Sequence, residues 1–181
     1  MKINLTLKNR IVFTAIVSIL MWAFLAWDYF HEGVPTHYIL HNKDLPGFSN
    51  WWGAITTPLV TWGLLYLIYL RTLKVAPKNE SLSIIYGFIG FFLYGIITSY
   101  FFSIGLETVL LYMMLGLILL SFFVPIYKPE CLLGYLLGMI YMFGSILPLL
   151  FGIIFWTLYI IAYQLPRIII RYFKSKKYNS T

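Results

Sequence analysis

The residues of this chain that are suited to chemistry gather in and beside one polar segment, residues 31–50. They are three histidines and three carboxylates: Asp28, His31, Glu32, His37, His41 and Asp44. Imidazole nitrogen and carboxylate oxygen are the usual ligands of a catalytic zinc ion, which keeps three protein ligands and an open position for water. A bound metal makes that water a nucleophile near neutral pH, and a free carboxylate can act as its base.

The spacing of these residues decides which of them can converge. If the first helix continues slightly beyond the membrane, His31 and Glu32 lie three and four residues after Asp28, so the three side chains share one helix face. Pro35 favours the first turn of a short helix, on which His37 and His41 lie one turn apart. Two such faces brought together would form a mixed site of imidazoles and carboxylates.

We therefore predict a site on the external face of the protein, built from this segment and from a second external turn. The predicted ligands of zinc or another divalent metal are His31, His37, His41 and Glu107. The predicted catalytic carboxylates are Asp28 and Glu32. Asp44 ranks below them, because Asp44-Leu45-Pro46-Gly47 is typical of a turn, with Pro second and Gly third.

The histidine segment has two alternative interpretations. In the first, the loop is structural, since histidines at a membrane interface are often only hydrated and Asp28 and Glu32 can solvate the end of the first helix. His37-x-x-x-His41 also lacks the acid of the H-E-x-x-H motif. In the second, the segment takes part in proton-linked transport, for which an acid below the interface, such as Asp28, would be a functional residue.

The composition determines the class of protein that must position these residues. Of 181 residues, 61% are hydrophobic and only 10% are charged, with a mean hydropathy of +0.84. These values exclude an ordinary soluble domain. The net charge of +7 does not indicate nucleic acid, because the basic residues lie between or after apolar runs rather than on a soluble face. We predict an all-α integral membrane protein, and we assign no role to its single cysteine, Cys131.

The apolar runs predict a helical bundle of about six membrane segments, in one domain covering residues 1–166. The run 82–126 would make a helix of about 68 Å, more than twice the roughly 30 Å of hydrocarbon, so it must fold back once. The run 131–163 is too long for one ordinary span and short for two. The predicted segments are about 10–30, 51–70, 82–102, 106–126, 131–147 and 149–165.

The basic residues predict the orientation, because they favour the cytoplasmic side of a membrane. If the last apolar run bends near Gly144-Ser145 and Pro148, both termini are cytoplasmic, and of the 13 basic residues only Lys43 is external. This arrangement has four spans plus a C-terminal hairpin or re-entrant pair. The alternative is one long, Pro-kinked last helix with an external tail.

Two further features predict contacts. Gly134-x-x-x-Gly138 allows close helix packing, either within the chain or between two copies in an oligomer. The tail, 167–181, places Arg167, Arg171 and Lys174 on one helix face beside isoleucines, which predicts a cytoplasmic interfacial helix that binds anionic lipid heads.

Two functional classes follow from the sequence. One is a metal-assisted hydrolase or transferase that acts on a lipid-like substrate entering between helices. The other is non-enzymatic, a small transporter or an accessory subunit whose external loop contacts a partner. In both, we expect a plasma or inner membrane with the histidine loop on the non-cytoplasmic side, and no nucleic acid as partner.

Overall fold

The computed structural model describes residues 5–31, 33–38, 44, 46–73 and 77–178. Within them lie six α-helices, one short 3-10 helix and two short strands, in the order α1 (Leu7–His31), β1 (Thr36–Tyr38), β2 (Gly47–Ser49), η2 (Asn50–Trp52), α2 (Gly53–Thr72), α3 (Pro77–Ser103), α4 (Glu107–Ser121), α5 (Pro129–Phe143) and α6 (Ile146–Tyr178). The predicted all-α class is confirmed.

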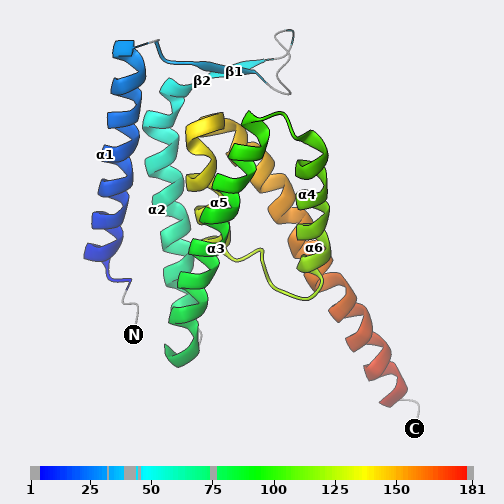
Figure 1. The fold of residues 1–181 in the computed structure, drawn as a ribbon. Coiled ribbons are helices and arrows are strands. Elements are labelled where there is room, and N and C mark those ends of the chain that lie inside the picture. The colour runs from blue at the N-terminus through cyan, green and yellow to red at the C-terminus, as the bar shows by residue number, and fades with distance from the viewer. Residues whose placement is uncertain (1–4, 32, 39–43, 45, 74–76, 179–181) are drawn as a thin grey trace.

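Four stretches are long and apolar enough to cross a membrane: Leu7–His31, Asn50–Thr72, Ser81–Ser103 and Ile146–Tyr172. The protein is therefore a multi-pass helical membrane protein. The two remaining helices, α4 and α5, are apolar but shorter, with 15 residues each. In Figure 1, α1 and α2 form one side of the bundle, α4 and α6 form the other, and α3 and α5 lie between them.

The start of α1, the end of α2 and the loop between α4 and α5 lie at the same end of the bundle (Figure 1), which we call the basal end. The two strands lie across the opposite end, where α1 finishes and α2 begins. They are antiparallel, with Thr36 opposite Ser49, His37 opposite Phe48 and Tyr38 opposite Gly47.

The strand β1 corrects the short helix that we predicted after Pro35. Threonine and tyrosine fit a pleated strand well, and β1 pairs with β2. The ring of Tyr38 lies against Gly47, where a Cβ would come within 2.8 Å of its Cε1 atom. His37 is consequently in a strand and not in the helix that we predicted, while His41 lies outside the described residues.

The closest packing in the bundle is between α3 and α5. A Cβ atom at Gly134 would collide with the carbonyl oxygen of Phe88, and one at Gly138 with that of Phe92. Gly95 of α3 also lies against the α5 backbone, since its Cβ would come within 2.8 Å of the Tyr135 oxygen. The Gly134/Gly138 face is therefore occupied by α3 of the same chain, which is the first of the two alternatives that the motif left open.

The last apolar run breaks where the glycine and serine predict it. α5 ends at Phe143, Gly144 has a φ of 66°, and α6 begins at Ile146. α6 then continues without interruption to Tyr178 and includes Pro166, so the basic tail is an extension of α6 rather than a separate helix. Its side chains are described as far as Tyr172.

Candidate functional site

The described residues of the predicted metal site do not form a cluster. No three His, Cys, Asp or Glu side chains within the described ranges are placed to hold a metal ion. Glu32 and His41 lie outside the described residues. Glu107 is exposed in the first turn of α4, at the same end of the bundle as Asp28 and His31 but on its other side (Figure 1). The external metal site stays a prediction of the sequence.

The described members of that site make contacts with residues close to them in the fold. His31 is exposed at the end of α1, where its ring stacks on Trp27 with centroids 3.9 Å apart and its Nδ1 lies 2.9 Å from the Trp27 carbonyl oxygen. Asp28 is half-buried, and its backbone oxygen accepts a 2.8 Å hydrogen bond from Gly33. His37 lies with Asn50 against Gly144, where the two side chains fill the space that a Cβ would need.

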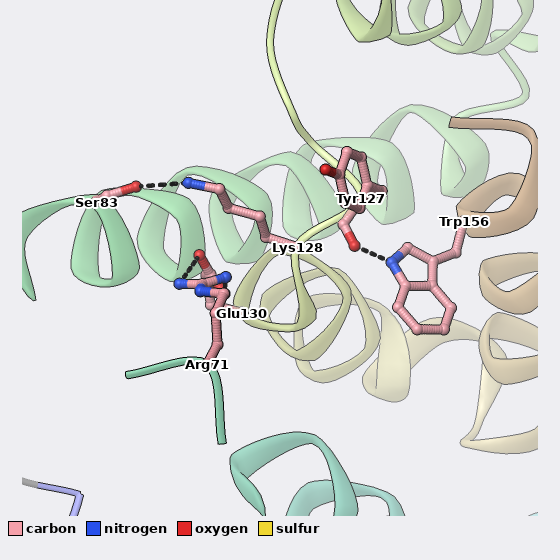
Figure 2. A network of polar contacts seen from close by, with 6 residues as sticks. All are labelled: Arg71, Ser83, Tyr127, Lys128, Glu130 and Trp156. Atoms are coloured by element: carbon pink, nitrogen blue, oxygen red, sulfur yellow. Dashed lines mark hydrogen bonds and ion pairs between the residues drawn. The ribbon is translucent and has the colours of Figure 1, made fainter. Parts of the chain in front are cut away.

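A polar network that the sequence did not predict lies at the basal end (Figure 2). Arg71, at the end of α2, donates two hydrogen bonds to Glu130 in the first turn of α5: Nη1 to Oε2 at 2.6 Å and Nη2 to Oε1 at 2.8 Å. Glu130 is 0% exposed and Arg71 is 21% exposed. This bidentate geometry is the strongest form of an Arg–carboxylate pair, and the guanidinium balances the negative charge of Glu130.

Lys128 lies next to this pair and has a different kind of partner. Its ammonium donates to the Ser83 hydroxyl of α3 at 3.1 Å, and within the described residues this hydroxyl is its partner (Figure 2). The loop that carries Lys128 is fixed to α6 at two points. Trp156 Nε1 donates to the carbonyl oxygen of Tyr127, and Arg167 donates to that of Phe122 at 3.2 Å. The backbone that carries the Lys128 ammonium is therefore held in place by α6.

A third basic residue of the basal end, Arg10 of α1, is 7% exposed. Its guanidinium lies over three aromatic rings of α2, with distances to the ring centroids of 5.2 Å for Trp62, 5.6 Å for Tyr66 and 4.4 Å for Tyr69. Such cation–π contacts stabilise a cation that has left water. Arg10 therefore joins α1 to α2 and does not reach the network around Glu130.

Two adjoining cavities lie on the α4 side of this network. The inner cavity, of about 170 Å³, lies between α3, α4, α5 and α6 and is lined mainly by apolar and aromatic side chains. The outer hollow, of about 590 Å³, lies between α3, the end of α4 and the start of α5, and it includes Lys128 and Glu130. Five residues line both: Phe91, Tyr94, Leu117, Ile126 and Cys131.

The two volumes suit different parts of a ligand. An apolar cavity of about 150 Å³ stays dry and takes up a molecule such as benzene, so the inner cavity is large enough for several methylene groups. The outer hollow has a volume typical of small-molecule sites, which run from about 300 to 1,000 Å³. Together they offer an apolar interior and a polar rim.

The sequence carried a weak signal for this site. Arg71 and Glu130 are charges at the ends of two apolar runs that the charge pattern places on one side of the membrane. In the sequence, Arg71 and Lys128 indicate only orientation, and Glu130 only marks a loop. The pairing depends on α2 and α5 being neighbours, which the spacing of apolar residues does not reveal.

The fold and the site define a class, a multi-pass helical membrane protein with an internal apolar cavity that adjoins a polar rim. Comparison with protein-family models, with curated proteins and with solved structures finds no match for the chain. Its function must accordingly be argued from its own residues.

Proposed function

We propose that this protein binds a lipid-like amphiphile from the surrounding bilayer, with the chain in the inner cavity and the polar end in the outer hollow. The observation that carries this proposal is that the two cavities adjoin through five shared residues. An amphiphile has the same order of parts, an apolar chain followed by a polar group. A ligand pocket with an apolar lining and a few placed polar groups is the usual form of a small-molecule site.

The proposed ligand comes from the cytoplasmic leaflet. Arg10, Arg71 and Lys128 belong to the basal end, and basic residues near the ends of spans favour the cytoplasm. In this orientation the strands and His37 are external, as are Asp28 and Glu107, and all six helices lie at membrane depth with both termini inside. The proposed lipid site is thus on the opposite side of the membrane from the predicted metal site.

The proposal names binding and no chemical step. A lipid-like ligand entering between helices belongs to both functional classes that the sequence favours, because an enzyme and a carrier or accessory subunit each need to hold it. The end of α6 adds a membrane contact. Ile168, Ile170 and Tyr172 are exposed there beside the exposed Arg171, a pattern that suits the interface of anionic lipid heads.

Filling the junction of the two cavities is expected to prevent binding. Leu117 of α4 lines both, so the indole of Leu117→Trp would occupy space that the chain needs. Leu115 is two residues away on the opposite face and 44% exposed, so Leu115→Trp adds the same ring on the outside of the bundle. The probe is a phospholipid with a diazirine in its acyl chain, and the readout is the labelling of the peptides that line the cavities. We expect this labelling to fall about tenfold in Leu117→Trp and to be unchanged in Leu115→Trp. A tenfold loss corresponds to about 1.4 kcal/mol of binding free energy.

The single cysteine supplies a second readout of the same test. Cys131 is buried and lines both cavities, so a bound chain shields it from a small thiol reagent such as methyl methanethiosulfonate. Added phospholipid should slow its modification in the wild type and in Leu115→Trp. Equal labelling of the two Trp variants and the wild type, with no protection of Cys131, would refute the proposed function.

A further inference from the structure

The outer hollow has an unbalanced positive charge, which limits what it can bind. Its charged lining residues within the described chain are Lys128 and Glu130. Both carboxylate oxygens of Glu130 are engaged by Arg71, at 2.6 and 2.8 Å, so that pair is neutral as a whole. Lys128 is partnered by a hydroxyl, which carries no charge. The hollow therefore has one positive charge in excess.

From this charge and its surroundings we propose that the hollow recognises the phosphate of an anionic membrane phospholipid through Lys128 and Ser83. The inference rests on the proposed function and adds the class of head group to it. An ammonium has three donors, of which Lys128 uses one on Ser83, and a hydroxyl that accepts a hydrogen bond still has its own hydrogen to donate. Two N–H groups and one O–H group thus remain to donate to a ligand that is rich in acceptor oxygens.

The rim that holds these donors is formed before any ligand arrives. α6 fixes the loop before Lys128 through Trp156 and Arg167, and Ser83 belongs to the regular helix α3. A site whose donors are already positioned loses less conformational entropy on binding. The head group therefore meets Lys128 without a rearrangement of the loop.

Two glycines of α3 beside this rim differ in the space around them, and Gly90 leaves room for a ligand. Gly90 lines the hollow and has nothing within 4 Å of the position where a Cβ would be. Gly87 lies against Glu130 and Cys131, where a Cβ would come within 2.9 Å of Glu130 Cγ and 3.2 Å of Cys131 Sγ. α3 is thus uncovered at Gly90, whereas at Gly87 it packs against Glu130 and Cys131 of α5. A phospholipid has a path from the bilayer along α3 to Lys128.

The test uses the full chain in phosphatidylcholine nanodiscs that contain a trace of a photoactivatable lipid with a diazirine in its acyl chain. The probes are phosphatidylglycerol, phosphatidylcholine and a free fatty acid, and the readout is the labelling of peptides from α3 to α6. We expect the wild type to be labelled about tenfold more by phosphatidylglycerol than by phosphatidylcholine, because both phosphates accept from Lys128 but the choline cation of phosphatidylcholine is repelled by the ammonium. Lys128→Gln should abolish this preference, and Lys128→Arg should retain it.

The controls separate this inference from the proposed function. Lys8→Gln removes an exposed positive charge from the start of α1 and should keep the preference. Leu117→Trp should lower labelling by every probe, because it fills the chain cavity. If Leu117→Trp lowers labelling but Lys128→Gln leaves the preference intact, the head-group inference is wrong and the proposed function stands. Stronger Lys128-dependent labelling by the fatty acid than by phosphatidylglycerol would also overturn the phosphate assignment. If Leu117→Trp has no effect, the proposed function itself fails.

Discussion

Replacing Arg71 by Met is expected to lower the free energy of unfolding by about 3–5 kcal/mol, the usual cost of leaving one partner of a buried ion pair alone. The reason is the burial of Glu130, which is 0% exposed and has both oxygens bound to the Arg71 guanidinium. Without that guanidinium the carboxylate is buried without its charged partner, which destabilises the folded protein relative to the unfolded chain, where water solvates the carboxylate.

The measurement uses Cys131, which is buried in the folded protein and reacts with a fluorogenic maleimide when the helices separate. We expect the midpoint of thermal unfolding to fall by about 10 °C in Arg71→Met, given the stability change and the length of the chain. Glu130→Gln should lose less, because the amide oxygen still accepts from Arg71. The control is Arg171→Met, which removes an exposed guanidinium from the end of α6 and should leave the midpoint unchanged.

The double variant Arg71→Met with Glu130→Leu distinguishes a missing charge partner from lost packing. Replacing both members of a buried pair by apolar residues is often neutral or stabilising, so we expect it to recover most of the lost stability. If the double variant is as unstable as Arg71→Met, the pair does not contribute through its charges. The same variant removes a neutral pair from the outer hollow and leaves the excess positive charge of Lys128, so phosphatidylglycerol labelling should persist in it.

The sequence was sufficient to predict a membrane protein, because that prediction depends only on the lengths of the apolar runs and on the composition. The bend near Gly144 was also predictable, since a run too long for one span has to break somewhere and glycine tolerates a positive φ. The strand at Thr36–Tyr38 was missed because Pro35 is compatible with the start of a helix and with an extended strand. Only its pairing with Gly47–Ser49 decides between them.

The cavities were beyond sequence reasoning for a related reason. The membrane helices are apolar on nearly all sides, so the spacing of apolar residues does not say which side faces lipid and which faces another helix. Leu115 and Leu117 are indistinguishable in the sequence, and yet Leu117 lines both cavities while Leu115 is exposed. The histidine cluster attracted attention because it is compact in sequence. Arg71 and Glu130 are far apart in sequence and meet only through the contact of α2 with α5.

The second large effect concerns the contact of α3 with α5, where we expect one added methyl group to lower the stability of the protein. In Gly134→Ala the new Cβ would collide with the Phe88 carbonyl oxygen and lie 2.9 Å from the Phe92 nitrogen. These are backbone atoms that no side-chain rotation can move, so the two helices must separate. We expect a loss of about 3 kcal/mol, at the upper end for overpacking, even though alanine favours a helix more than glycine does.

The matched control is Gly63→Ala in α2, where nothing lies within 4 Å of the new Cβ. There the methyl group meets open space, and the higher helix propensity of alanine should leave stability unchanged or raise it by up to about 1 kcal/mol. The two variants carry the same chemical change with opposite expected signs, read from the thermal exposure of Cys131. A Gly134→Ala protein as stable as Gly63→Ala would mean that α3 and α5 are not in backbone contact. The inner cavity, which both helices line, would then need a different boundary.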